Sequence, residues 1–371
     1  MTSESATPLR TPLFQTHQRL GARMVPFAGW EMPLTFAGQV EEHRAVREAA
    51  GLFDVSHMGQ ILIMGRGAEA FLQELVPGNV AALEPGRSRY TQLCNESGGI
   101  LDDLIMTRLG GEEFLAVVNA ARRTVDLAAI RGRAEAHEGD VHVVDESPRW
   151  AMIAVQGPEA LGILEKTLPG TAWRATPPFS FHVLDEGGST LCISRTGYTG
   201  EAGAEILCPG EEAEDWWNRL LAEGAMPCGL AARDSLRLEA GYCLYGQDLD
   251  EETTPVEASL AWSCAWKKPE HWPGREVHER QRSESPPRRL VGLLSESRRP
   301  LRAGDAILTE DGEEAGHVTS GGYSPVLERG IALGYVRPPF LGGDRFQVAG
   351  RGKPVPVSKV RPPFVRRPGS N

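Results

Sequence analysis

Two spacings of apolar residues alternate along this chain, and together they predict a mixed α+β fold. Apolar positions three and four residues apart indicate helices at 39–50, 68–75, about 120–136, 159–166 and 213–222. Short apolar runs and period-two alternation indicate strands at 60–64, 89–95, 100–109, 114–119 and 150–155. Three successive strands followed by one helix predict an antiparallel sheet rather than a doubly wound parallel one.

The last quarter of the chain has a different pattern. Residues 275–289 are dominated by charged side chains and contain Pro286-Pro287, so we expect an exposed linker there. Beyond it, short apolar runs separated by Gly, Pro and Asp turns predict a small all-β barrel or sandwich of about 80 residues. A chain of 371 residues exceeds one ordinary core. We therefore expect an α+β region at 1–280 and a separate β domain at 288–371.

Composition narrows the class of protein. The formal net charge of −11 disfavours nucleic acid as a partner. The longest apolar runs, at 61–64 and 151–155, are much shorter than a membrane span, and the N-terminal residues lack the pattern of a signal peptide. The cysteines form no CxxC pair and the histidines no metal-spaced cluster, so we expect reduced thiols and no metal site. These features predict a cytoplasmic, bacterial-type enzyme.

Two adjacent aspartates, Asp102 and Asp103, lie in a predicted strand, where aspartate is depleted. Because neighbouring side chains in a strand point to opposite faces, one carboxylate is expected to face a pocket while the other meets solvent or a cap. Asn119 ends the neighbouring strand and is expected near the mouth of the same pocket. The alternative is that the aspartates only make a strand edge soluble and that the asparagine only serves a turn.

A helix is predicted after Gly229, and it carries Arg233 and Arg237 on one face. Like charges four residues apart repel each other, which favours an anionic ligand as their common target. The alternative is an internal ion pair with Asp234 or Glu239.

The segment Arg195-Thr-Gly-Tyr-Thr-Gly-Glu201 is a second candidate for ligand binding. Its two glycines would let the backbone approach a flat ligand, on which Tyr198 could stack, and Glu205 follows shortly after. A simple hairpin is the alternative. His57 stands alone between Phe53 and Gly59, and we expect it to be a structural histidine.

In their order along the chain, these segments resemble the T-protein family of the glycine cleavage system, which are folate-dependent aminomethyltransferases. The resemblance runs from Arg10-Thr-Pro-Leu13 to Val360. The motifs that carry it are Pro26-Phe-Ala-Gly-Trp-Glu-Met-Pro33, Phe53-Asp-Val-Ser-His-Met-Gly59, Gly98-Gly-Ile-Leu-Asp-Asp103, Gly197-Tyr-Thr-Gly-Glu201, the long string from Gly229 to Glu257, and Thr319-Ser-Gly321.

The resemblance implies two folate-binding α+β domains, partly interleaved in sequence, and a C-terminal all-β barrel, in a cloverleaf arrangement around a central channel. It implies that the one-carbon unit of S-aminomethyl-dihydrolipoyl H-protein passes to tetrahydrofolate, the co-substrate. Ammonia, 5,10-methylenetetrahydrofolate and dihydrolipoyl H-protein would be the products. Lipoylated H-protein would be the partner, and neither a metal nor a membrane would take part.

Roles are carried over from the family position by position. Asp103 would be the key acid/base residue. The side chains that would line the folate site are Met58, Tyr90, Asn119, Tyr198, Glu205 and Arg233. One departure concerns the C-terminus, where some relatives carry a folate-contacting tyrosine. No tyrosine follows Tyr335 here, and Phe364 is the available aromatic residue.

Three alternative functions stay open. The first is a tetrahydrofolate-dependent O- or S-demethylase of the same family, which would share the folate site. The second is a non-enzymatic iron–sulfur maintenance relative, but the stretch at 195–198 lacks the cysteine of the Lys-Gly-Cys-Tyr type motif. The third is a nucleotide-dependent oxidoreductase, suggested by the string Gly65-Arg-Gly-Ala-Glu-Ala70, which lacks a clear βαβ continuation.

Overall fold

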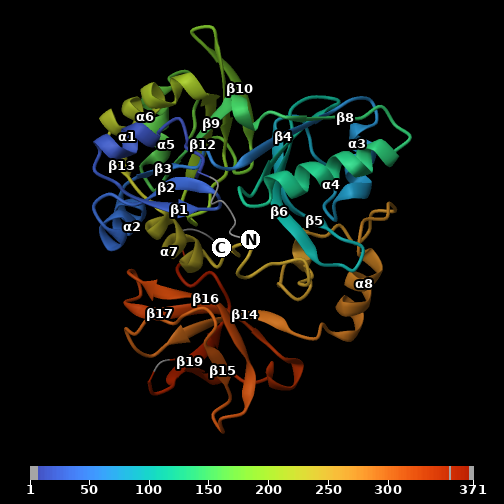
Figure 1. The fold of residues 1–371 in the computed structure, drawn as a ribbon, viewed down its shortest axis with the longest axis vertical. Coiled ribbons are helices and arrows are strands. Elements are labelled where there is room, and N and C mark those ends of the chain that lie inside the picture. Colours follow the sequence, from blue (N-terminus) through green and yellow to red (C-terminus); the bar gives the residue numbers. More distant parts are fainter. Residues whose placement is uncertain (1–6, 351, 367–371) are drawn as a thin grey trace. The chain divides into compact units, whose positions relative to one another are not determined.

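A computed structural model describes residues 7–350 and 352–366. Its contacts divide the chain into two compact units that interleave in sequence (Figure 1). The first unit holds the residues up to 60 together with 145–197 and 201–234, and the second holds 61–144, 198–200 and everything from 235 onward. The mixed α+β class is confirmed. The domain limits at 280 and 288 stay predictions, and the outer ends of both predicted domains, 1–6 and 367–371, lie outside the described residues.

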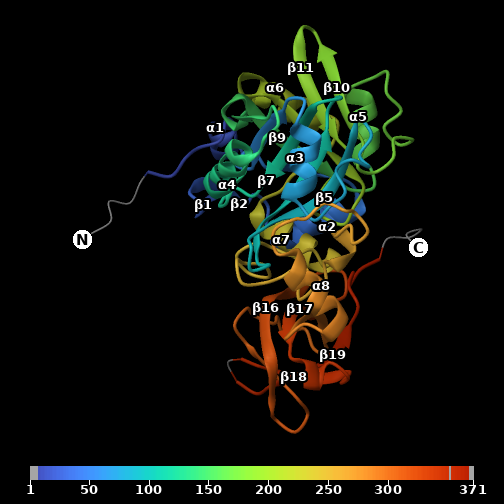
Figure 2. The same ribbon diagram turned by 90° about the vertical axis from the view of Figure 1, so that its right-hand side faces the viewer.

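The first unit is built on a six-stranded sheet with the strand order β10-β11-β12-β9-β3-β13. Its strands are β3 (Gly51–Asp54), β9 (Trp150–Gln156), β10 (Phe181–Glu186), β11 (Ser189–Ser194), β12 (Gly203–Pro209) and β13 (Met226–Pro227). A separate hairpin is formed by β1 (Arg23–Phe27) and β2 (Trp30–Thr35). The β10–β11 hairpin projects from one edge of the sheet (Figure 2).

Helices cover this sheet and close its core. They are α1 (Phe14–Arg19), α2 (Gln39–Glu48), α5 (Ala160–Thr167) and α6 (Ala213–Ala222). Helices α5 and α6 pack against β9 and β12, with Trp173 and Trp217 fully buried in the core (Figure 1). Strand β9 is almost entirely buried, which explains why its sequence is a continuous apolar run rather than an alternating one.

The second unit contains a five-stranded sheet with the strand order β5-β6-β7-β4-β8. Its strands are β4 (Gly59–Met64), β5 (Arg87–Cys94), β6 (Ile100–Arg108), β7 (Glu113–Val118) and β8 (His142–Asp145). The helices that accompany it are α3 (Ala68–Leu75) and α4 (Arg123–Ala136). Strands β5, β6 and β7 form an antiparallel meander, as the sequence predicts, and α4 packs against β6.

The C-terminal part of the second unit is a closed six-stranded β-barrel, which confirms the predicted barrel. Its strands are β14 (Arg289–Ser295), β15 (Ala306–Leu308), β16 (Glu314–Ser324), β17 (Arg329–Val336), β18 (Arg345–Ala349) and β19 (Val355–Val360). Closure leaves no free strand edge. Alternate residues of these strands, such as Ile307, Val318 and Val348, fill the interior.

The predicted linker at 275–289 is wrong for its first ten residues, which form helix α8 (Arg275–Glu284). An ion pair between Arg275 Nε and Glu279, 2.8 Å long, supports the helix at i,i+4 spacing. His278 is fully buried: its Nδ1 accepts a 3.2 Å bond from Trp272 Nε1, and its Nε2 lies 2.8 Å from the carbonyl oxygen of Gly98. The long-range bond to Gly98 and the local bond from Trp272 hold in place a segment whose charged surface indicated a linker.

Helix α7 (Leu230–Ala240) forms as predicted and ends before Gly241, whose φ of +73° suits a glycine at this position. Arg237 pairs with an acidic residue that the sequence analysis did not name. Its Nη1 lies 3.0 Å from Asp248 Oδ2, and its Nη2 donates a 2.9 Å bond to Ser320 Oγ on β16. Arg237 therefore ties the end of α7 to the barrel within the second unit.

Among residues 7–350 and 352–366, no helix combines the length and the apolar character needed to span a bilayer. The six cysteines are all buried as free thiols.

Candidate functional site

Strand β6 carries the two aspartates in the interior of the second unit's sheet, between β5 and β7. Their side chains alternate as predicted: Asp102 is fully buried, whereas Asp103 is partly exposed. Strand-edge solubility is excluded, because β6 is not an edge strand. Of the two surroundings expected for the other carboxylate, solvent or a cap, solvent is excluded, because Asp102 is fully buried and accepts a 2.9 Å bond from the backbone N–H of Asn119.

Asn119 joins both carboxylates. It follows β7 directly, and the β6–β7 register, which pairs Ile105 with Val117, brings it opposite Asp103. Its Nδ2 donates to Asp102 Oδ1 at 2.8 Å and to Asp103 Oδ1 at 2.9 Å. The other oxygen of Asp103 accepts a 2.9 Å bond from the hydroxyl of Tyr90 on β5. Sequence analysis predicted all three residues, and the structure connects them.

The surroundings of Asp103 make it a carboxyl group that titrates near neutrality. Burial, followed by the negative charge of Asp102, raises the pKa of Asp103 to about 7, and the bonds from Tyr90 and Asn119 oppose this only in part. Burial raises the pKa of Tyr90 well above its usual value, so its hydroxyl remains a donor. A carboxyl group that can both hold and release a proton at neutral pH is suited to acid/base catalysis.

The second unit also presents aromatic rings, one of which contacts Tyr90 of this cluster. Trp262 is 70% exposed and stacks on Tyr90, with ring centroids 5.7 Å apart and an interplanar angle of 21°. Tyr198 donates its hydroxyl to the carbonyl oxygen of Cys243, and its ring lies 5.9 Å from that of Tyr242. Sequence analysis did not single out Trp262, because one exposed tryptophan does not belong to the apolar periodicity of a helix or a strand.

Glu205 and Arg233 belong to the first unit. Glu205 lies on β12, paired with Ser194 of β11, and accepts a hydrogen bond from the hydroxyl of Thr196. Burial raises the pKa of Glu205, while the Thr196 hydroxyl and the charge of Arg233 lower it. The carboxylate is therefore held in a buried site with a cation nearby.

A buried glutamate fixes the start of the helix that carries Arg233. Glu42 is fully buried and accepts a 2.7 Å bond from the backbone N–H of Gly229, immediately before α7. It also accepts bonds from the N–H groups of Phe36 and Gly38, at 2.6 and 2.9 Å. A side chain at Gly229 would approach the carbonyl oxygen of Leu34 to 2.3 Å, so only glycine fits there. Arg233 thus stands on a rigidly anchored helical turn.

The turn after β3 holds His57 and Met58 in the first unit. Burial is the main cause that lowers the pKa of His57 to about 4, so the imidazole is neutral. The Asp54 carboxylate before this turn binds His17 Nε2 at 2.8 Å and the Thr11 hydroxyl at 2.6 Å. Burial alone would raise the pKa of Asp54, but these hydrogen bonds lower it to about 2. The ionised Asp54 therefore anchors the turn that presents the half-buried Met58.

The two glycines between Arg195 and Glu201 have a structural reason that the sequence analysis did not foresee. A side chain at Gly197 would come within 1.9 Å of the Gln156 side-chain oxygen, so the close approach is to another part of the chain. Gly200 has a φ of +78°, which favours glycine. The close contact at Gly197 and the positive φ at Gly200 are enough to explain why glycine occupies these two positions, without a flat ligand.

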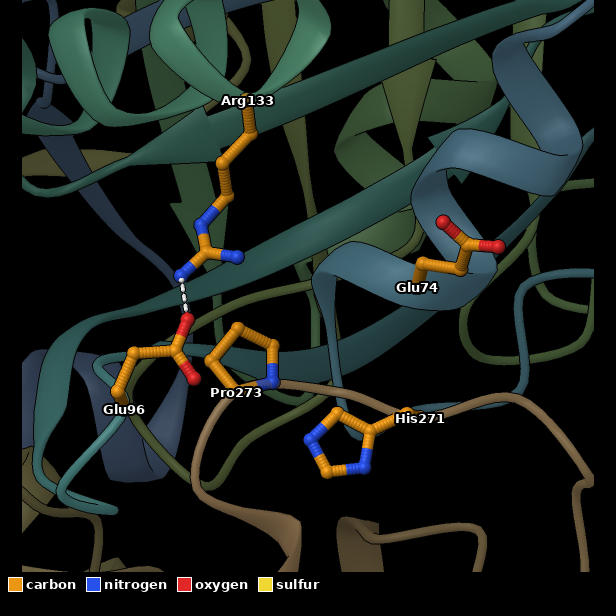
Figure 3. A pocket seen from close by; sticks show the side chains of 5 residues that line it. All are labelled: Glu74, Glu96, Arg133, His271 and Pro273. Carbon is orange, nitrogen blue, oxygen red and sulfur yellow. Dashed lines mark hydrogen bonds and ion pairs between the residues drawn. The ribbon is translucent and has the colours of Figure 1, made fainter. Parts of the chain in front are cut away.

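The predicted site residues thus fall into two groups. Those of the second unit are Tyr90, Asp103, Asn119 and Tyr198, and those of the first are Met58, Glu205 and Arg233. Among the described residues, no group of three His, Cys, Asp or Glu side chains is arranged to hold a metal ion. A pocket of about 230 Å³ in the second unit is lined by Glu74, Glu96, Arg133, His271 and Pro273, none of them predicted (Figure 3). Arg133 Nη2 donates to Glu96 at 2.7 Å, which offsets one of the two acidic charges of this lining.

Comparisons with known proteins extend over nearly the whole chain. The GCVT N-terminal domain matches residues 13–268, and the glycine cleavage T-protein C-terminal barrel domain matches residues 288–366. A curated aminomethyltransferase of Nitrosococcus oceani is 48% identical over 360 residues, which cover 96% of this chain and 94% of the relative. One of Rubrobacter xylanophilus is 47% identical over 358 residues, with 96% and 94% covered.

A solved structure agrees with these matches. The crystal structure of glycine cleavage system aminomethyltransferase T from Bartonella henselae has a TM-score of 0.89 to this fold and is 37% identical, covering 96% of this chain and 98% of that one. These matches confirm the family indicated by the motifs. The chain therefore belongs to the glycine cleavage T-protein family of aminomethyltransferases.

Proposed function

We propose that this chain transfers the one-carbon unit of S-aminomethyl-dihydrolipoyl H-protein to tetrahydrofolate, releasing ammonia and forming 5,10-methylenetetrahydrofolate and dihydrolipoyl H-protein. The observation that carries the proposal is the cluster of Asp102, Asp103, Asn119 and Tyr90 in a chain of the aminomethyltransferase family. We assign no role to a metal or a redox cofactor.

We propose the cytoplasm as the compartment, because six buried free cysteines suit a reducing environment.

The bonds that change define what Asp103 must do. One carbon–sulfur and one carbon–nitrogen bond break in the donor, and two carbon–nitrogen bonds form to the folate. Two folate nitrogens each give up a proton, and these protons end on ammonia and on the lipoyl sulfur. Asp103 is suited to accept such a proton, because its pKa is about 7. While ionised, it also stabilises positive charge that develops at the transferred carbon.

The rate of transfer is expected to depend on pH through Asp103. Because the pKa of this carboxyl group is about 7, its base form is lost as the pH falls below that value. We expect kcat/KM to fall about tenfold per pH unit on the acid side. Asp103→Glu should keep this acid limb at a lower rate, whereas Asp103→Asn should lose it, as measured by ammonia release over a pH series. A rate that rises as the pH falls through 7 would contradict the base role.

Glu205 and Arg233 are expected to bind the pterin ring of tetrahydrofolate. A buried carboxylate suits the pterin amino group and ring N–H, and a guanidinium suits its carbonyl oxygen. We expect Glu205→Gln and Arg233→Ala each to weaken tetrahydrofolate binding by about 1.5–3 kcal/mol, the usual contribution of a hydrogen bond to a charged group. Isothermal titration calorimetry measures this loss.

The matched control is Glu201→Gln. Glu201 lies in the same segment and pairs with Arg47 at 2.6 Å, so its loss should lower thermal stability and leave folate affinity unchanged. If the Glu205 and Arg233 variants behave in the same way as this control, the two residues form a structural pair rather than a binding site.

Ammonia release from aminomethylated H-protein, with and without tetrahydrofolate, tests the reaction itself. Tetrahydrofolate-dependent release and formation of 5,10-methylenetetrahydrofolate are the expected results. Removal of a methyl group from an oxygen or sulfur donor, without ammonia release from H-protein, would instead establish the demethylase alternative.

A further inference from the structure

Trp262 is the most exposed large apolar side chain among residues 7–350 and 352–366, with an exposed fraction of 70%. It lies on a short 3₁₀ helix, η3 (Ala261–Ser263), in the second unit. Its indole stacks on the ring of Tyr90, and the Tyr90 hydroxyl donates to Asp103 at 2.9 Å. One tyrosine therefore joins the Asp103 carboxyl group to an open aromatic ring.

The turn that carries Trp262 is held in place on both sides. Ser259 has a φ of +59°, which is a strained conformation for a residue other than glycine, and its hydroxyl donates to the carbonyl oxygen of Leu290 at 2.9 Å. Ser263 Oγ lies 2.9 Å from Oε1 of the fully buried Gln92 on β5. An exposed indole on a fixed, strained turn is preorganised to bind a ligand.

Cations of the chain already lie over four other tryptophan rings. The distances from the guanidinium carbon to the ring centroid are 4.8 Å for Arg149 and Trp150, 4.0 Å for Arg219 and Trp216, 4.7 Å for Arg282 and Trp266, and 4.5 Å for Arg275 and Trp272. Among the described residues, no Lys or Arg side chain lies over the ring of Trp262. Since tryptophan is the aromatic side chain that attracts cations best, this ring remains available for a cation of the substrate.

The donor of the reaction proposed above brings such a cation. The transferred carbon must come close to Asp103 if this residue is to act on protons there. The nitrogen on that carbon leaves as ammonia, so it is protonated when the carbon–nitrogen bond breaks. An ammonium one bond from the transferred carbon is attracted by the negative face of an indole, whereas a neutral methyl donor lacks this attraction.

We propose that Trp262 determines the specificity for the donor, because its open indole face binds the ammonium of the aminomethyl group and so favours an aminomethyl donor over a neutral methyl donor. The inference rests on the proposed function and deepens it by naming the residue that recognises the donor. The pterin ring is assigned to Glu205 and Arg233 of the first unit, so the two substrates depend on different side chains.

Two non-reacting probes that differ in charge test this recognition. S-(2-aminoethyl)-dihydrolipoamide ends in an ammonium, and S-propyl-dihydrolipoamide ends in a methyl group of similar size. Their affinities are measured by calorimetry with the full chain carrying Asp103→Asn, because the Asp103 charge would itself attract an ammonium. We expect the ammonium probe to bind about three- to thirtyfold more tightly than the propyl probe. Equal affinities, or no binding of either probe, would overturn the proposal.

Substitutions of Trp262 show whether the indole causes this preference. Trp262→Leu keeps an apolar side chain but removes the ring, so the preference for the ammonium probe should disappear. Trp262→Phe keeps a ring that binds cations less well, so part of the preference should remain. Val326→Ala, at a 45% exposed apolar position between β16 and β17, is the control and should leave the preference unchanged.

The reaction gives a second readout in the chain that retains Asp103. Trp262→Leu should raise the KM for aminomethylated H-protein about threefold or more, with the KM for tetrahydrofolate unchanged. A preference for the ammonium probe that survives Trp262→Leu would overturn the proposal. Weaker tetrahydrofolate binding in that variant, with the preference intact, would identify the indole as a platform for a folate ring instead.

Failure of the proposed function is seen separately from failure of this inference. If the preference depends on Trp262 but the unaltered chain releases no ammonia from aminomethylated H-protein, the ammonium site stands. The donor assigned to that site then falls together with the proposed function.

Discussion

Replacing Asp103 by asparagine is expected to slow one-carbon transfer about 10²–10⁴-fold, the usual contribution of a proton-transfer residue. The asparagine has the same shape but cannot accept a proton at neutral pH. Tyr90 and Asn119 donate to different oxygens of Asp103, so only one of them can still donate to the asparagine carbonyl oxygen. The backbone pairing of β6 with β5 and β7 is unchanged, so the strand and the meander around it should remain intact. Single-turnover ammonia release measures the rate, and calorimetry should show that tetrahydrofolate still binds.

Asp102→Asn is the matched control for this variant. Asp102 is fully buried and accepts one bond from the backbone N–H of Asn119 and one from its side-chain amide. Its substitution therefore disturbs the residue that supports Asp103 rather than the proton acceptor itself. We expect a smaller loss of rate and an acid limb at lower pH, because the charge of Asp102 is one of the causes that raise the pKa of Asp103. A larger loss from Asp102→Asn than from Asp103→Asn would identify the other carboxylate as the catalytic group.

Local patterns predicted the parts of this site that depend on strand geometry. The alternation of side chains along β6 separates Asp102 from Asp103, and the meander brings Asn119 back to the same point of the sheet. Both features follow from the order of apolar runs and turns, so the sequence was sufficient. The barrel was predictable for the same reason, since its short strands are separated by clear turn residues.

Contacts between residues distant in sequence could not be predicted in this way. Asp126 has the pattern of an ordinary acidic residue in the first turn of a helix, and only the tertiary fold buries its side chain completely. Helix α8 was missed because its surface is highly charged, while the buried His278 that anchors it bonds to Gly98. The acidic partner of Arg237 was also missed, since Asp248 lies in an irregular segment eleven residues later.

That pair leads to the largest expected effect on stability. The side chains of Arg237 and Asp248 are 2% and 0% exposed, and the guanidinium also donates to Ser320 Oγ at 2.9 Å and to the carbonyl oxygen of Tyr242 at 3.1 Å. Arg237→Met would leave the Asp248 carboxylate buried without its counter-charge. We expect a loss of about 3–5 kcal/mol in the free energy of unfolding, measured by chemical denaturation of the full chain.

Two further variants show whether the buried charge causes this loss. Adding Asp248→Asn to Arg237→Met removes the uncompensated carboxylate, and the double variant should recover part of the stability. Arg345→Met breaks an exposed pair with Glu296, 2.7 Å long, and should cost no more than about 1 kcal/mol. Equal losses for Arg237→Met and Arg345→Met would show that burial adds nothing to the pair. A double variant no more stable than Arg237→Met would mean that lost packing of the long arginine side chain, rather than an unpaired carboxylate, determines the effect.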